Sequence, residues 1–173
     1  MLYLNLGSGV HPAPGWVNVD WVVEHPVEAS VDVAANVLDL PFVDECADRV
    51  YIGHTLEHLA YGDDAPQMLR EAWRVLRWNG ELAVVGPAMD LAVEQNQPQH
   101  LLDAIQAGGG DLNLPGSAHQ WTATSRNTWV LVQSVFPNAM LVPVRDIHRM
   151  TGWANNDIAG WQVAVLASKV DPL

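Results

Sequence analysis

Two glycines and a carboxylate near the start of the chain form the pattern with the clearest chemical use. Gly7-Ser8-Gly9 follows a short alternating segment, residues 2–6, and Asp20 ends a second such segment. Glycines directly after a strand let the backbone approach a ligand closely and adopt dihedral angles that a Cβ would forbid. Ligands bind at the carboxyl ends of parallel strands. We therefore expect Asp20 to lie beside the glycine turn and to accept hydrogen bonds from vicinal hydroxyls.

This pattern does not match a dinucleotide-binding fingerprint. Pro12 stands where the third glycine of G-x-G-x-x-G would be, and Asp20 follows Gly9 much sooner than the spacing of about 20 residues that such a fingerprint has. Nicotinamide binding is therefore disfavoured. An ordinary tight turn between two core strands remains the alternative interpretation of the motif alone.

A second group of residues could bind a metal. His54-Thr55-Leu56-Glu57-His58 matches H-x-x-E-H, the inverted zinc-protease signature. Zinc would need both histidines on one helical face and a third ligand, whereas His54 ends a predicted strand and His58 follows it. We therefore predict no metal and no stoichiometric zinc. A zinc hydrolase that uses His54 and His58 is the less favoured alternative, and helix capping by Glu57 and His58 is the structural one.

Histidines are also the candidates for acid–base chemistry, because their side chains titrate near neutral pH. His119 precedes Trp121 and is our first choice as a general base. If it is one, His119→Ala should lower turnover about a hundredfold and leave cofactor affinity nearly unchanged. His54 and His58 are the other candidates, with His54 acting more through its backbone. A surface-loop position for His119 is the alternative.

Short apolar segments alternate with helical patterns along the chain. Strands are predicted over residues 2–6, 17–20, 31–37, 48–53, 81–86, 140–144 and 161–168. One helix is predicted to start at Asp63 or Asp64, with Pro66 in its first turn, and to end at Asn79-Gly80. A second is predicted over 125–136, capped by Thr124 or Ser125, and residues 91–107 are expected to be helical with a break near Pro98. The pattern indicates a single α/β domain, residues 1–173, with a mostly parallel sheet and an antiparallel edge strand.

Two connections are unusual. Only residues 10–16 separate Gly9 from Val17, whereas a parallel crossover normally needs a dozen or more residues. We therefore expect a first crossover without a helix of more than one turn. Residues 88–120 form a long insertion after a predicted strand and contain Gly108-Gly109-Gly110. We interpret this insertion as a lid or a substrate-side segment with the triple glycine as its joint.

Composition limits the partners. The chain carries 20 Asp and Glu against 8 Lys and Arg, a net charge of −12, so its surface repels phosphate backbones and nucleic acid is not expected. A small-molecule acceptor fits better, and a homodimer is left open. No apolar run reaches about 18 residues, so no membrane span is expected. The first predicted strand begins near Leu2, which leaves no room for a signal peptide and suggests a cytoplasmic protein.

Six segments in this order resemble class I S-adenosylmethionine-dependent methyltransferases, in the broad subgroup called methyltransferase type 11. These segments are LNLGSG, GWVNVD, DLPF, DRVYIGHTLEH, LREAWRVLRWNGELAVV and AHQWTATS. The resemblance implies a Rossmann-like fold and S-adenosylmethionine as the cofactor. It covers residues 3–87 well and 119–168 loosely.

The resemblance also implies roles for the residues of the first two strands. Gly7, Ser8 and Gly9 match the glycine loop that lies under the methionine and ribose portions of the cofactor. Asn5 matches the position that helps to hold the methionine amino group. Asp20 matches the acid that binds both ribose hydroxyls, a role that a carboxylate can fill well with two hydroxyl donors.

Further roles follow for the strands beside them. Trp21 matches an apolar position that packs on adenine. Asp39 and Leu40 match the pair whose side chain and backbone N–H read the adenine edge. Gly53 and His54 match backbone that contacts the methionine end.

Our interpretation is a minimal Rossmann-like methyltransferase. The sulfonium methyl group of S-adenosylmethionine is already activated, so the protein mainly has to align an acceptor with that methyl group. The chain departs from the family pattern at His11, where a third glycine is common, and at Trp78-Asn79-Gly80, which replaces Pro-Gly-Gly. A non-catalytic cofactor-binding or interaction module on the same fold is the main alternative.

Overall fold

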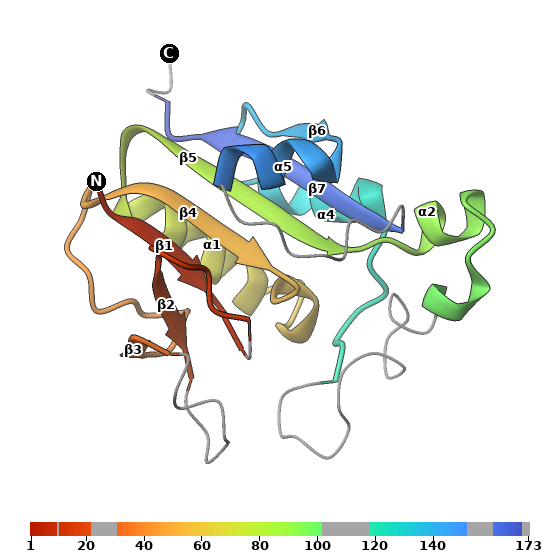
Figure 1. Ribbon diagram of the computed structural model, residues 1–173, viewed down its shortest axis with the longest axis horizontal. Helices are drawn as coiled ribbons and strands as arrows, with labels where there is room; N and C mark the ends of the chain where they lie inside the picture. Colours follow the sequence, from red (N-terminus) through yellow and green to blue (C-terminus); the bar gives the residue numbers. More distant parts are fainter. Residues whose placement is uncertain (10, 22–30, 102–117, 152–160, 171–173) are drawn as a thin grey trace.

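The computed structural model describes residues 1–9, 11–21, 31–101, 118–151 and 161–170. Their strands form one seven-stranded sheet in the order β3-β2-β1-β4-β5-β7-β6 (Figure 1). The strands are β1 Tyr3–Leu6, β2 Val17–Asp20, β3 Val33–Ala34, β4 Ala47–Gly53, β5 Leu76–Pro87, β6 Met140–Val142 and β7 Gln162–Ser168. Strands β1 to β5 pair in parallel, and β7 is antiparallel to both β5 and β6. The predicted α/β fold, mostly parallel with an antiparallel edge, is confirmed.

Helices cover both faces of this sheet. They are α1 Asp64–Val75, α2 Met89–Glu94, α4 Ser125–Gln133 and α5 Val144–Thr151, with 3-10 turns η2 Leu56–His58 and η3 Pro98–His100. Figure 1 shows α1 and α4 on one face and α5 on the other. The larger core lies under α1 and α4 and includes the fully buried Met68 and Phe136. No helix in the described ranges has the length and apolar character that crossing a bilayer requires.

A smaller core on the α5 face contains the short first crossover. It joins Ala13 and Trp16 to Ile147 of α5 and to Tyr51 of β4. Residues 11–16 contain no helix, in agreement with the prediction from their length. The crossover thus buries two side chains where a helix would bury a whole face.

A buried amide network holds this crossover in place. Oδ1 of Asn18 accepts hydrogen bonds from the Asn5 amide (2.9 Å) and from the Ala13 N–H (2.7 Å). The Asn18 amide in turn donates to Asp32 (2.9 Å). Asn5 and Asn18 are 2% and 6% exposed. Buried polar groups need such partners. The side chain of Asn18 therefore fixes residues 11–16 by hydrogen bonds, as backbone hydrogen bonds fix the residues of a helix.

We expect Asn18→Ala to lower the free energy of unfolding by about 2–4 kcal/mol, because it leaves the Asn5 amide and the Ala13 N–H buried without their acceptor. Urea denaturation of the variant and the wild type measures this loss. Asn138→Ala is the matched control, because Asn138 also bonds a side chain, that of Ser168 (2.8 Å), but is only half-buried. Equal losses in the two variants would contradict the special role of Asn18.

The predicted end of the first helix at Asn79-Gly80 is wrong. Helix α1 ends at Val75, and Leu76 is already extended (φ −65°, ψ 133°) and pairs with Ala47 in the sheet. Asn79 has a left-handed backbone (φ 61°) but lies within β5, where its N–H donates to the Lys169 carbonyl (2.8 Å). Sheet pairing therefore takes over from the helix before the left-handed position is reached.

Two other elements are shorter than predicted. The third strand is Val33–Ala34 rather than 31–37, and the second helix ends at Gln133 rather than 136. Thr124 caps that helix as predicted, since its Oγ1 accepts from the Asn127 N–H (3.1 Å) and Asn127 bonds back. In the predicted helix 91–107, α2 ends at Glu94. Residues 102–107, the triple glycine and the middle of the predicted 88–120 lid lie outside the described residues.

Candidate active site

The glycine turn lies at the edge where the parallel strands end. Gly7 and Gly9 both have positive φ angles, 69° and 51°. The N–H groups of Gly7 and Ser8 donate to the Val19 carbonyl (2.8 and 3.2 Å), which fixes the turn against β2. The Gly9 N–H donates to Oδ2 of Asp20 (2.6 Å). Asp20 thus lies beside the turn, as expected, and has a second carboxylate oxygen to offer.

This turn has the properties of a polar ligand cradle. Ser8 is 4% exposed, and its hydroxyl has no hydrogen-bond partner among the described residues. A Cβ placed on Gly9 would meet no atom within 4 Å, so the space in front of it is open. A buried hydroxyl without a partner is costly. A ligand that enters this space can supply the missing partner.

Thr55 ties the glycine turn to β4, a contact that sequence reasoning missed. Its hydroxyl donates to the Gly53 carbonyl (3.1 Å) and lies 3.4 Å from the carbonyls of Leu6 and Gly7. A Cβ on Gly7 would lie 2.2 Å from the Thr55 Oγ1. Thr55 occupies a variable position of H-x-x-E-H, so only the adjacency of β1 and β4 could have pointed to it.

His54 follows β4 with a left-handed backbone (φ 52°) and uses both ring nitrogens. Its Nδ1 lies 3.3 Å from Oε1 of Glu57, and its Nε2 lies 2.8 Å from the Gln162 amide nitrogen. A ring with its proton on Nδ1 directs that N–H toward Glu57 and accepts from Gln162, so one tautomer suits both neighbours. The His54 N–H donates to the Val85 carbonyl (2.8 Å). Its predicted backbone contact with the cofactor is therefore limited to the carbonyl.

Glu57 is the buried carboxylate of the site, with 2% of its surface exposed. Burial alone would raise the pKa of Glu57, but the close approach of the His54 ring and the charges of His54 and His58 hold that pKa below its ordinary value. The prediction that His54 and Glu57 lie together at the rim agrees with this geometry.

His119 reaches the same place from a remote segment. Its ring centroid lies 4.8 Å from that of His58, and it is 7% exposed. The Gln120 N–H donates to the Glu57 carbonyl (2.7 Å), and the Trp121 indole N–H donates to the Leu56 carbonyl (3.2 Å). The structure therefore brings His58 and His119 together, and His54 lies against Glu57 of the same turn. The surface-loop alternative for His119 does not fit its burial, and its role as a general base stays a prediction.

The predicted adenine-side residues are less closely grouped. The Leu40 N–H donates to Oε2 of Glu71 (2.8 Å) in a buried position, so this N–H already has an acceptor, and its predicted contact with adenine stays a prediction. Asp39 is exposed. Asn36 lies nearer the end of β3 than Asp39, and its Oδ1 accepts from the Leu38 N–H (2.9 Å).

Two further predicted cofactor residues have clear positions. Trp21 is 63% exposed, so its ring is accessible next to Asp20. The Asn5 amide nitrogen donates to Asn18 and to the His11 carbonyl (3.4 Å). Any contact of Asn5 with a ligand would therefore be made through its oxygen. His11 itself is exposed.

An ion pair on α1 holds Glu71 in the position where it accepts from the Leu40 N–H. Arg74 donates to both oxygens of Glu71 (2.9 and 2.7 Å) and to the carbonyls of Leu40 (2.9 Å) and Phe42 (2.8 Å). The hydrogen bond from Arg74 lowers the pKa of Glu71. The pair thus fixes residues 40–42 against the helix.

From this lowered pKa we expect a pH-dependent contribution to stability. A carboxyl whose pKa is depressed by folding stabilises the protein at neutral pH, and this stabilisation is lost as the pH falls through the pKa of the folded state. Glu71→Gln keeps the acceptor for the Leu40 N–H and removes the charge. Urea denaturation should therefore show Glu71→Gln less stable than wild type at pH 7, with a difference that shrinks below about pH 4.5. A difference independent of pH would contradict this assignment.

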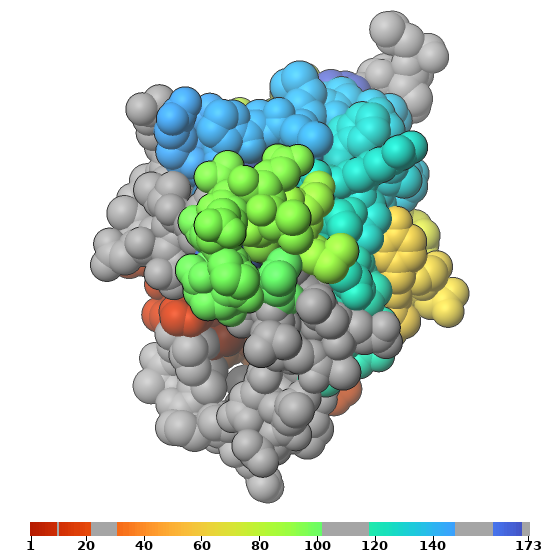
Figure 2. Space-filling view, turned by 90° about the vertical axis from the view of Figure 1, so that its right-hand side faces the viewer, coloured from red at the N-terminus to blue at the C-terminus, as the bar shows by residue number. Residues whose placement is uncertain are grey.

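Residues 88–101 pack over the end of the site. The Ala88 N–H donates to the Trp161 carbonyl (2.9 Å), and the His100 ring stacks on the Trp161 ring at 4.8 Å. Trp161 also meets the edge of His54 at 5.8 Å. Figure 2 shows this segment (green) in the middle of one face of the molecule, next to the stretch that starts at residue 118 (teal). These contacts concern residues 88–101 only, and the role of 88–120 as a lid or substrate-side insertion stays a prediction.

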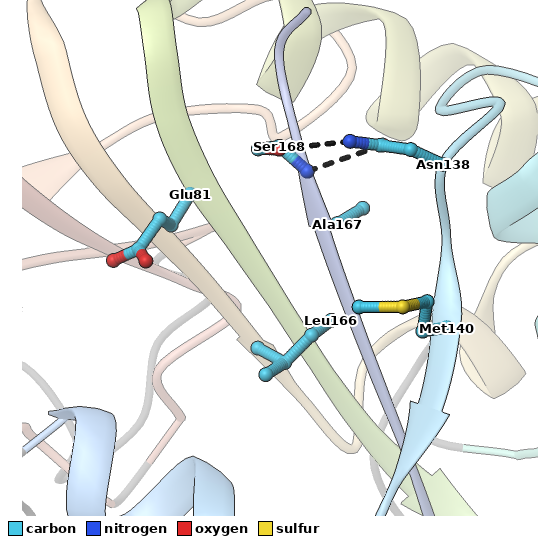
Figure 3. A pocket seen from close by; sticks show the side chains of 6 residues that line it. All are labelled: Glu81, Asn138, Met140, Leu166, Ala167 and Ser168. Atoms are coloured by element: carbon cyan, nitrogen blue, oxygen red, sulfur yellow. Dashed lines mark hydrogen bonds between the residues drawn. The ribbon is translucent and has the colours of Figure 1, made fainter.

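A pocket lies at the other end of the sheet (Figure 3). It is lined by Glu81, Asn138, Met140, Leu166, Ala167 and Ser168. Glu81 pairs with Ser168 in the middle of β5, whereas the candidate site lies beyond Gly86 at the end of that strand. This pocket is therefore separate from the candidate active site.

The comparisons with known proteins agree with this geometry. Residues 9–84, less than half of the chain, match the family model described as a methyltransferase domain. A methyltransferase from Thermotoga maritima, described as a possible histamine N-methyltransferase, has a similar structure (TM-score 0.61, 15% identity, 97% of this chain and 82% of that one). Human N-acetylserotonin methyltransferase, solved with S-adenosylmethionine, is also similar (TM-score 0.56, 16% identity, 98% and 48%). The predicted resemblance to class I S-adenosylmethionine-dependent methyltransferases is confirmed.

The fold alone does not fix the reaction. The [4+2]-cyclase SpnF is also similar, with a TM-score of 0.55 and 13% identity over 97% of this chain and 75% of that one. No curated protein sequence matches the chain significantly. The reaction therefore depends on the residues of the site rather than on the fold.

Proposed function

We propose that this protein binds S-adenosylmethionine and transfers its methyl group to a small or polar acceptor other than nucleic acid. The observation that carries the proposal is the cradle at the ends of β1 and β2. There an unpartnered buried hydroxyl, on Ser8, and open space over Gly9 lie next to the carboxylate of Asp20. This combination suits a ligand with vicinal hydroxyls and a charged amino-acid end.

Different residues of the chain would hold different parts of the cofactor. Gly7 and Gly9 allow the backbone to approach it, because their positive φ angles keep the turn narrow. Asp20 would accept hydrogen bonds from the ribose hydroxyls with the oxygen that the Gly9 N–H does not use, and the exposed ring of Trp21 would pack on the adenine. When bound, S-adenosylmethionine supplies an electrophilic methyl group. The protein then has to align the acceptor and exclude water.

The acceptor enters at the rim formed by His54, His119 and residues 88–101. That rim brings imidazole rings beside an indole: the Trp161 ring meets the edge of His54 and stacks on His100. The net charge of −12 disfavours a phosphate-rich acceptor and favours a neutral or cationic one. The Trp161 indole N–H is buried and has no hydrogen-bond partner among the described residues, so it can donate to an acceptor oxygen.

Two measurements test this function in sequence. Calorimetric titration with S-adenosylmethionine and with its demethylated product tests the cradle, and the transfer of a labelled methyl group to a metabolite extract tests the reaction. Binding followed by transfer is the expected result. Binding without transfer to any component would favour the non-catalytic module on the same fold. If neither form of the cofactor binds, the proposal fails.

A further inference from the structure

A cluster of one carboxylate and two imidazoles lies beside the proposed methyl-transfer site, with Glu57 and His119 buried and His58 half-buried. Glu57, His58 and His119 each present one ligand atom, and these three atoms all lie within 4.8 Å of one another. From this cluster we infer a binding site for a divalent transition-metal ion of the zinc class. The inference rests on these three side chains and does not depend on the proposed methyl transfer.

The backbone fixes the two segments that supply the cluster. Glu57 and His58 belong to η2, and His119 belongs to the segment that returns at residue 118. The Gln120 N–H donates to the Glu57 carbonyl (2.7 Å), directly beside the cluster. The Trp121 indole anchors the same segment to the Leu56 carbonyl. Both neighbours of the cluster are thus held by hydrogen bonds, so the ligands are positioned before any ion arrives.

The burial of the cluster leaves polar atoms that an ion would satisfy. Glu57 is 2% exposed, and its Oε1 has a contact with His54 Nδ1 at 3.3 Å but no hydrogen bond of good geometry. Nδ1 of His58 is buried without a hydrogen-bond partner among the described residues. A buried carboxylate is costly unless a positive charge compensates it. A divalent cation between Glu57 and the imidazoles would do so more fully than His54 alone.

The ligand set matches the preferences of zinc. Imidazole nitrogens and carboxylate oxygens bind Zn²⁺ at about 2.0–2.2 Å, which places neighbouring ligand atoms about 3.4 Å apart in a tetrahedral site. The ligand atoms would therefore have to approach by about 1.4 Å at most, which side-chain rotation can supply. Two histidines and one glutamate leave a fourth position open, which water or an acceptor oxygen can occupy. Mg²⁺ and Ca²⁺ prefer oxygen ligands and fit less well.

This proposal revises the sequence-based expectation of no zinc. That expectation considered His54 and His58, which the H-x-x-E-H motif suggests. In the structure, the ring nitrogens of His54 contact Glu57 and Gln162, and His54 is not part of the cluster. His54 can instead orient the Glu57 carboxylate, as outer residues commonly do at metal sites. His119, which lies 61 positions after His58, takes the place of the missing ligand.

The test is zinc binding to protein stripped with a chelator and dialysed. Competition titration with Zn²⁺ and a chromophoric chelator should show one site per chain with micromolar or tighter affinity. Co²⁺ should give the visible absorption of a tetrahedral site. His58→Ala and His119→Ala should each weaken Zn²⁺ binding at least a hundredfold. His11→Ala and His100→Ala change histidines outside the cluster, so their Zn²⁺ affinity should stay within about twofold of the wild-type value.

Folding is monitored separately, because the cluster is buried. If an alanine variant unfolds, His119→Gln and Glu57→Gln replace it, since they keep side-chain volume and remove a strong ligand. Thermal melts of wild-type protein should show an unfolding temperature that rises on adding Zn²⁺, and the rise should be absent in the substituted variants. Unchanged Zn²⁺ affinity in folded cluster variants, or no site in the wild type, would overturn the proposal.

The same preparations separate this proposal from the proposed function. Calorimetry with S-adenosylmethionine on metal-free protein tests the cradle without the metal. Cofactor binding without zinc binding would overturn the metal site and leave the methyltransferase assignment standing. Zinc binding without cofactor binding would overturn the methyltransferase assignment and leave the metal site standing.

Discussion

Gly7→Ala is expected to lower the thermal unfolding temperature by about 5–15 °C. The substituted residue would have to keep a positive φ of 69°, which costs about 1–2 kcal/mol for a side chain with a Cβ. Its Cβ would also lie 2.2 Å from the Thr55 Oγ1, so the turn or the end of β4 must shift, at a further cost of about 1–3 kcal/mol. For a chain of this length, each kcal/mol changes the unfolding temperature by about 2–4 °C. Differential scanning calorimetry measures the shift.

Other glycines separate these two costs. Gly15 has a φ of 79° and open space around its Cβ position, so Gly15→Ala should show the backbone cost alone. Gly9→Ala has the same backbone problem without a clash, but its methyl group enters the proposed cradle, so it should weaken cofactor binding more than it lowers stability. The double variant Gly7→Ala/Thr55→Ala should recover part of the stability lost in Gly7→Ala. A Gly7→Ala variant as stable as Gly15→Ala would refute the contact with Thr55.

Asp20→Ala is expected to weaken S-adenosylmethionine binding about tenfold or more. It removes a charge-assisted acceptor for two hydroxyls, which is worth roughly 1.5–3 kcal/mol. It also removes the acceptor of the Gly9 N–H, so the turn itself is affected. Asp20→Asn keeps an oxygen for that N–H and removes the charge, so it should bind with intermediate affinity. Isothermal titration calorimetry of the three proteins gives the comparison, and equal affinities in wild type and Asp20→Ala would refute the placement.

Much of the fold could be predicted from the sequence because its signals are local. Alternation and β-branched residues identify the strands that end at Asp20 and Gly53, and the capping residue Thr124 marks the start of α4. The length of residues 10–16 alone excluded a crossover helix. The side-by-side position of the glycine turn and Asp20 follows from parallel pairing of β1 and β2, so it too could be predicted.

The features that escaped prediction depend on contacts between distant residues. The N–H of Leu40 is bonded to a glutamate 31 positions away on α1, so no local pattern shows that it is occupied. Thr55 and Asn18 gain their roles from neighbouring strands. The end of α1 was misplaced because sheet pairing of Leu76 overrides the turn preference of Asn79-Gly80. His119 and His58 meet only because the chain returns to η2 after the long insertion.

The strand order has a consequence for how the protein is made. β7 is inserted between β5 and β6, although β6 precedes it in the chain, and in the described residues β6 pairs only with β7. On the ribosome, β6 therefore emerges before its partner exists, and β5 presents an open edge. Met140 and Leu141 of β6 are still 61% and 51% exposed in the folded protein. Unpaired apolar edges promote aggregation, so soluble yield in a cell depends on how quickly β7 closes the gap.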